Sequence, residues 1–111
     1  MSMARKALWF WGDEMGHDIS GYRVEDTEQR DEIAYLRRSA VNPLKITIYN
    51  ALDCHEMNGG CSGIGEVRKF AQTEIVDALS RIPDGDEYEP ERAFLRDCIA
   101  AGEAGVVIAF G

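Results

Sequence analysis

Hydrophobic and polar positions along the chain alternate in segments that predict four strands. Residues 16–23 (GHDISGYR) lie between glycines and alternate loosely, which favours a short strand or turn. Residues 32–40 (EIAYLRRSA) alternate on two faces, so we interpret them as a strand although their spacing also fits a helix. Residues 65–71 (GEVRKFA) alternate in the same way, and the apolar run at 105–111 (GVVIAFG) predicts a final strand that is central or pairs at an edge.

The strongest helix-start signal in the chain lies at Asn42. An asparagine N-cap can accept hydrogen bonds from the free amides of the first turn, and Pro43 loses nothing there by lacking a donor. Apolar residues then recur on one side at helical spacing: Leu44, Ile48, Ala51 and Leu52. The β-branched run at 46–48 lowers the helix propensity, so tertiary burial must hold this helix. Glycines at 59–60 end it.

Two further helices follow in the second half of the chain. Thr73 is the expected cap of a helix that runs to residue 82, ahead of a proline. Pro90 opens a third helix, which turns Phe94 and its helical neighbours inward and ends at Gly102, an expected left-handed terminator.

The predicted order is therefore β, β, α, β, α, α, β, without an internal repeat. This order predicts an α+β fold: a mixed or antiparallel sheet of about four strands with three helices packed on one face. Residues 15–111 form the single domain. Residues 1–14, the leader, form either an extra edge strand or an extension that packs on a neighbouring molecule through Trp9 and Trp11.

Composition and charge narrow the classes of function. The formal charge of -8, from 20 acids against 12 bases, would repel nucleic acid and anionic membrane surfaces. The apolar run at 7–11 is too short for a signal-peptide core or a membrane span. Three cysteines without a secretory signal indicate reduced thiols in a cytoplasm. We expect a cytoplasmic protein that contacts neither nucleic acid nor membrane directly.

Acidic residues gather at 84–91 (DGDEYEPE), where five acids occur without a base. A solvated acidic turn is the simplest interpretation, because the EF-hand pattern fails at its sixth and twelfth positions. A sharper hypothesis is a surface that binds a basic partner or imitates nucleic acid. Its candidate residues are Asp84, Asp86, Glu87 and Glu89.

A thiol or metal site is the second chemical hypothesis. Cys54, His55 and Cys61 lie close in sequence, and zinc accepts thiolate and imidazole ligands. The paired knuckle of structural zinc is absent, and a fourth ligand would have to come from His17 or Asp18. The loop at 59–65 (GGCSGIG) could instead hold an oxyanion near Cys61 and Ser62, but it lacks the phosphatase and P-loop spacings. Cysteines packed as small hydrophobes are the simpler interpretation, so we predict no cofactor and no metal.

Several segments together resemble a type of short bacterial protein of unassigned activity that begins near GHDIS. They are GHDISGY, EIAYLRR, NPL followed by IYNAL, GCSGIG and the closing FG. The resemblance covers residues 15–111 and implies that GHDIS is a structured element and Met15 an alternative start. It carries no site or reaction.

The sequence therefore favours a small binding or accessory protein without catalysis. It would act by contact with a partner protein, and it could form a homodimer through the final strand or the leader. Two alternatives stay open: a thiol or metal enzyme centred on His17, Cys54, His55 and Cys61, and an acidic mimic of nucleic acid.

Overall fold

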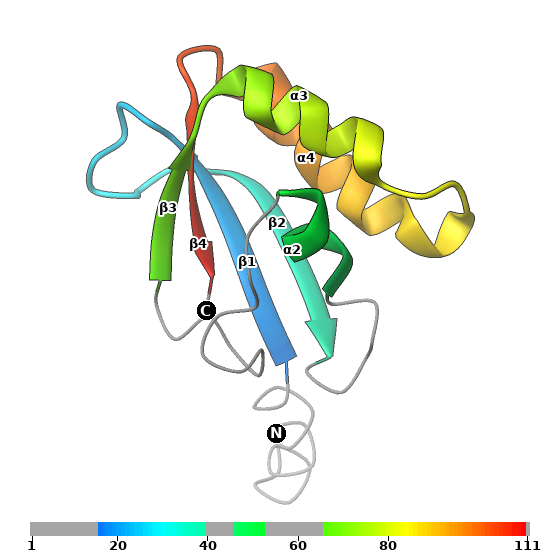
Figure 1. The fold of residues 1–111 in the computed structure, drawn as a ribbon. Helices are drawn as coiled ribbons and strands as arrows, with labels where there is room; N and C mark the ends of the chain where they lie inside the picture. The colour runs from blue at the N-terminus through cyan, green and yellow to red at the C-terminus, as the bar shows by residue number, and fades with distance from the viewer. Residues whose placement is uncertain (1–15, 40–45, 53–65, 111) are drawn as a thin grey trace, which may run out of the picture.

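The computed structural model describes residues 16–39, 46–52 and 66–110. Its elements follow the chain in the order β1 (Gly16–Arg23), β2 (Glu32–Ser39), α2 (Ile46–Ala51), β3 (Glu66–Phe70), α3 (Gln72–Arg81), the 3-10 turn η3 (Asp86–Tyr88), α4 (Glu89–Ala101) and β4 (Val106–Phe110). The predicted order of strands and helices is confirmed, and η3 is added ahead of the last helix (Figure 1).

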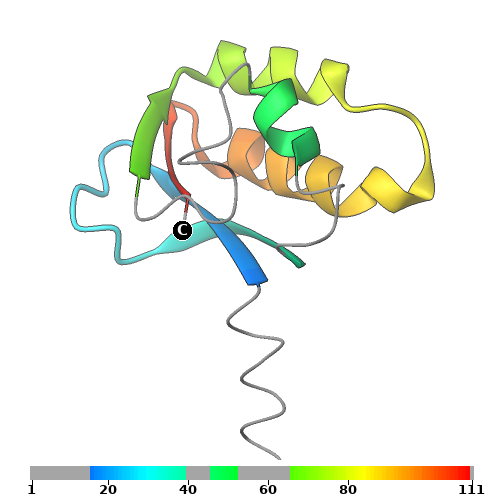
Figure 2. The ribbon, with the colours of Figure 1, turned by 60° about the horizontal axis from the view of Figure 1, so that its bottom comes forward.

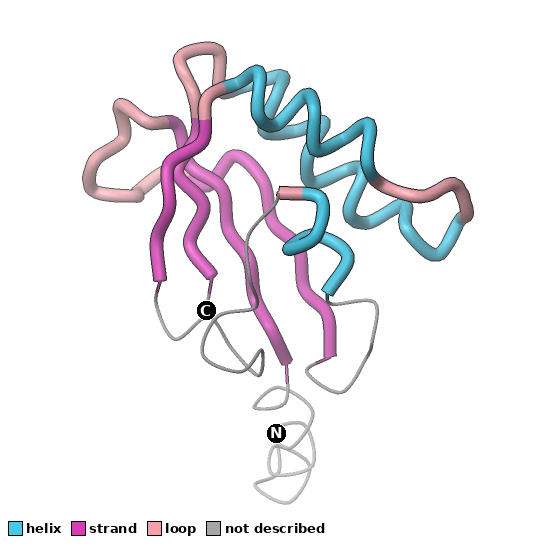
Figure 3. The backbone as a smooth tube through the Cα atoms, in the orientation of Figure 1, coloured by secondary structure: helices cyan, strands magenta, loops and turns pink. Residues whose placement is uncertain are grey.

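The four strands form one antiparallel sheet in the order β2-β1-β4-β3 (Figure 3). In β1, Ile19 has Leu36 of β2 and Phe110 of β4 as its two neighbours. Strand β4 pairs with β1 on one side and β3 on the other, so the final strand is central. Both of its edges are occupied, and self-association by edge pairing of this strand is not possible in this fold.

The helices of the described segments all lie on one face of the sheet (Figure 2), which confirms the predicted α+β architecture. Alternate strand residues turn toward this helix layer and form the core with it. The sheet contributes Ile19, Ala34, Leu36, Phe70, Val106, Ile108 and Phe110, and helices α3 and α4 contribute Ile75, Ala78, Phe94, Leu95 and Cys98. No helix in these segments is long and apolar enough to cross a membrane.

Helix α2 is short and is held by burial, as its β-branched residues require. Ile48 is fully buried, and Ala51 and Leu52 are buried beside it, as predicted. Tyr49 is also buried and stacks on Phe110 of β4, with ring centroids 5.1 Å apart and an interplanar angle of 27°. The expected start at Asn42 and Pro43, the inward Leu44 and the glycine end at 59–60 lie outside the described residues.

One predicted helix boundary is wrong, and so is the predicted conformation at another. Helix α3 has Ala71, not Thr73, as its N-cap, because the Glu74 carboxylate reaches back and accepts a 2.7 Å hydrogen bond from the Ala71 amide. Gly102 ends α4 but is not left-handed, since its φ is -110°. It is required for space instead: a Cβ there would lie 2.3 Å from Val106 Cγ1.

Helix α4 packs directly on β1 at Gly21. A Cβ built on Gly21 would lie 3.0 Å from Cys98 Sγ, 3.4 Å from Ala34 Cβ and 3.6 Å from Phe94 Cζ. The missing side chain therefore sets how closely the helix approaches the sheet. Any larger residue would have to push α4 outward or distort β1.

We expect Gly21→Val to lower the free energy of unfolding by about 1–3 kcal/mol, the usual cost of overpacking. Because valine favours strands, a lower free energy of unfolding would reflect the collision with α4 and not a lower strand propensity. Urea unfolding measures it. In a Cys98→Ala background, which removes the nearest atom, Gly21→Val should cost less; an equal cost in both backgrounds would contradict the contact.

Candidate functional site

The sheet face opposite the helix layer is a candidate surface among the described residues. Strand alternation and the pairing register assign its residues: Asp18, Ser20 and Tyr22 of β1, Tyr35 and Arg37 of β2, Val67 and Lys69 of β3, and Val107 and Ala109 of β4. We call this set the open face. A sheet with one covered and one solvated face is common, so a solvated face is not by itself evidence of a binding site. The side chains that the open face exposes decide whether it could bind a partner.

One row of residues across the open face has large apolar side chains at its two ends and small side chains in its middle. Tyr35 pairs with Ser20, Ser20 with Ala109, and Ala109 with Val67. The side chains at the two ends are strongly exposed, Tyr35 at 50% and Val67 at 45%. Among the described residues only Val76, on helix α3, is a comparably exposed large hydrophobe. The row therefore exposes apolar surface at both of its ends, with the smaller Ser20 and Ala109 between them.

The ring of Tyr35 is fixed by a polar cluster at one end of the open face. Its hydroxyl donates a 2.5 Å hydrogen bond to Asp18 Oδ1, and Arg37 Nη1 donates to the same oxygen at 2.7 Å. The bond to the Asp18 carboxylate stabilises the protonated phenol and raises the pKa of Tyr35. The three groups therefore hold one another, and the cluster orients Tyr35 without providing a general base.

Asp18 and His17 are neighbours in β1, where His17 pairs with Arg38 of β2. Their predicted companions in a thiol or metal site, Cys54, His55, Cys61 and Ser62, lie outside the described residues, as do Trp9 and Trp11. Within residues 16–39, 46–52 and 66–110, no group of three or more metal-ligating side chains is found. The remaining cysteine, Cys98, is fully buried, and burial raises its pKa to about 12, so its thiol is unreactive at neutral pH.

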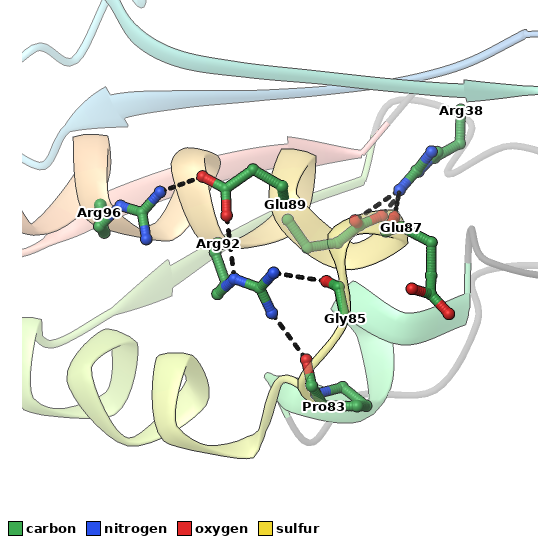
Figure 4. Close-up of polar contacts among 8 residues, drawn as sticks. Arg38, Pro83, Gly85, Glu87, Glu89, Arg92 and Arg96 are labelled. Atoms are coloured by element: carbon green, nitrogen blue, oxygen red, sulfur yellow. Dashed lines mark hydrogen bonds and ion pairs between the residues drawn. The ribbon is translucent and has the colours of Figure 1, made fainter.

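Three arginines fix the acidic segment at 84–91 (Figure 4). Arg92 donates to the carbonyls of Pro83 and Gly85 at 2.7 and 2.5 Å, and Arg38 Nη2 donates to the carbonyl of Glu87 at 2.7 Å. Arg92 and Arg96 both pair with the Glu89 carboxylate, which lowers its pKa.

The acids of this segment therefore differ in their surroundings. Glu89 and Glu91 are neutralised by arginines, whereas Asp84, Asp86 and Glu87 are exposed and enter no ion pair in the part of the chain that the structure describes. Only three of the four candidate residues of the mimic hypothesis remain free to meet a basic partner.

The ion pair of Arg38 with Glu91 was not foreseen from the sequence. Glu91 is fully buried in the first turn of α4 and accepts from Arg38 Nε at 2.8 Å and from Nη2 at 2.7 Å. The sequence contained a signal for this ion pair, because Arg38 occupies an inward position of its strand, after Ala34 and Leu36. An arginine there requires a carboxylate from the helix layer.

A shallow hollow of about 340 Å³ lies where α2 approaches the end of α3. It is lined by Thr47, Asn50, Ala51, Arg81, Pro83 and Tyr88. Arg81 is its one charged lining residue and donates a 2.7 Å hydrogen bond to the Ala51 carbonyl. The hollow therefore lacks a paired acid and base, and it offers less to a partner than the open face does.

Comparison with known proteins adds no family to this geometry: no protein-family model, no curated protein and no solved structure matches the chain.

The buried ion pair gives a direct test of how α4 is held on β2. We expect Arg38→Met and Glu91→Leu each to lower the free energy of unfolding by about 3–5 kcal/mol, because each leaves one charge without its partner. The double variant should recover most of the loss, as two apolar side chains replace the pair. Urea unfolding of all four proteins measures the coupling.

The exposed pair of Arg96 with Glu89 is the matched control. Arg96→Met should change the free energy of unfolding far less than Arg38→Met does, because solvent screens that pair. If Arg96→Met and Arg38→Met lower the free energy of unfolding equally, the buried ion pair stabilises the fold no more than the exposed one does.

Proposed function

We propose that this chain is a small binding protein without catalysis, which acts by contact between its open face and a segment of a partner protein. The row of Tyr35, Ser20, Ala109 and Val67 carries the proposal, because it exposes a large apolar side chain at each of its two ends on one face of the sheet. Antiparallel pairing of four strands keeps this row in place before any partner arrives, which lowers the entropy lost on binding.

The size of the open face favours a linear segment over a globular surface. Four strands at a spacing of about 4.8 Å, with about 3.3 Å per residue along each, give a face of roughly 19 Å by 17 Å. A standard interface between globular proteins buries about 800 Å² per partner, well beyond that area. A peptide segment that inserts aliphatic or aromatic side chains between Tyr35 and Val67 fits the space.

The charges around the row favour a partner segment that is basic at one end. The β1–β2 turn beside the far end of the open face contains Glu25, Asp31 and Glu32, and none of these enters an ion pair within the described residues. Asp26 shapes the turn by accepting hydrogen bonds from the amides of Arg30 and Asp31 at 3.2 and 2.9 Å. Basic residues at one end of a partner would meet this turn while its apolar residues cover the row.

Val67 and Val76 allow a matched test, since they are the same residue type, 45% and 47% exposed, on β3 and α3 respectively. A photo-crosslinking amino acid placed at position 67 should capture a defined protein in cells, whereas the same group at 76 should not. The captured protein, once identified and purified, should bind wild type and Val76→Asp equally. Val67→Asp should weaken its binding by at least about tenfold, because the partner would have to remove the new carboxylate at position 67 from water.

Circular dichroism establishes that both aspartate variants fold. The proposal fails if Val67→Asp folds and binds the partner as wild type does. If Asp84→Asn/Asp86→Asn/Glu87→Gln abolishes binding while Val67→Asp leaves it intact, the acidic segment is the contact and the open face is not.

A further inference from the structure

The chain itself contains a segment with the chemistry that the open face fits. The leader contains Arg5 and Lys6, which are followed by an apolar run that ends in Trp9, Phe10 and Trp11, and it precedes β1 in the chain. We propose that the leader occupies the open face of its own molecule, so that a partner must displace it. The inference rests on the proposed function, because it assigns an internal competitor to the same surface.

The connection to β1 is long enough for this contact. Trp11 lies five residues before Gly16 and Trp9 seven, which gives reaches of up to about 17 and 24 Å. Ser20, in the middle of the apolar row, lies four residues into β1, or about 13 Å from Gly16. If the chain reverses direction at Gly12–Met15, Trp11 lies near Gly16, and Trp9, two residues further along, brings its indole to the row between Tyr35 and Val67.

The order of charges along the leader matches the open face in this reversed direction. Apolar residues of the leader would cover the row, and Arg5 and Lys6, further from Gly16, would then lie toward the β1–β2 turn. This turn lies at the end of β1 away from Gly16 (Figure 1). That turn carries Glu25, Asp31 and Glu32 without ion pairs among the described residues. If the leader ran away from the sheet instead, Arg5 and Lys6 would lie far from the acidic residues of this turn.

Pairing of the leader as a strand beside β1 is not possible, because β2 and β4 already occupy both edges of β1. Its tryptophans would need a face of the sheet or one of the outer edges of β2 and β3. The face under the helices is filled by the core, where Ile19, Ile108 and Phe110 are at most 1% exposed. Among the described residues, the open face is the apolar surface of the sheet that the helix layer leaves uncovered and that lies within the reach of the leader.

Tryptophan fluorescence tests the contact directly, because Trp9 and Trp11 are the two tryptophans of the chain and report only on the leader. In the full chain we expect emission at shorter wavelength than in urea, and protection from iodide quenching. Val67→Asp should shift the emission to longer wavelength and raise the quenching constant severalfold. Val76→Asp should leave both unchanged, and Val67→Thr, which keeps the shape, should give a smaller change of the same sign.

Unprotected tryptophans in wild type, or protection that Val67→Asp leaves intact, would overturn the proposal; the second result would place the leader at an outer sheet edge. Protection that is lost on dilution would also overturn it, since the leader would then bind a second copy of the chain.

A labelled peptide of residues 4–12 separates this proposal from the proposed function. It should bind the full-chain variant Trp9→Ala/Trp11→Ala at least about tenfold more tightly than wild type, where the face is occupied. Adding Val67→Asp should abolish that binding. Equal binding to wild type and the tryptophan variant would overturn the leader contact, yet the crosslinked partner would still establish the function of the open face.

Discussion

The close approach of α4 to β1 at Gly21 determines the form of the whole molecule. With no side chain at this position, Cys98 and Phe94 of the helix lie directly on the strand, and the helix layer covers one face of the sheet tightly. Burial of Cys98 follows from the same contact, and so does the loss of its reactivity. A sheet packed this firmly on one side leaves its other side as the surface on which a small chain can present side chains to a partner.

The buried pair of Arg38 with Glu91 complements that apolar contact with a directional one. It joins the outer strand β2 to the first turn of α4, and Arg38 also holds the carbonyl of Glu87, so one guanidinium connects the sheet to the acidic segment. Apolar packing tolerates small rotations, whereas a two-point hydrogen-bonded pair fixes an orientation. The segment at 84–91 is consequently a structured link between helices, and two of its five acids, Glu89 and Glu91, are neutralised by arginines.

Local patterns predicted most of the fold, and non-local pairing explains what they missed. Alternation located the strands and assigned Val67 to the face opposite Phe70, as the structure has it. That Val67 shares a row with Tyr35 depends on β4 lying in the middle of the sheet, which no local signal specifies. The cap of α3 at Ala71 was missed because the acceptor belongs to a side chain three residues later. The partner of Arg38 lies 53 residues away.

Amide chemical shifts measured by NMR on wild type and on Trp9→Ala/Trp11→Ala test the central claim most directly, that the open face holds the leader of its own chain. The account predicts shift changes at Ser20, Tyr35, Val67 and Ala109, which form one row across the four strands, and none around Val76. Changes confined to the helix layer, or no changes beyond the substituted segment, would contradict it.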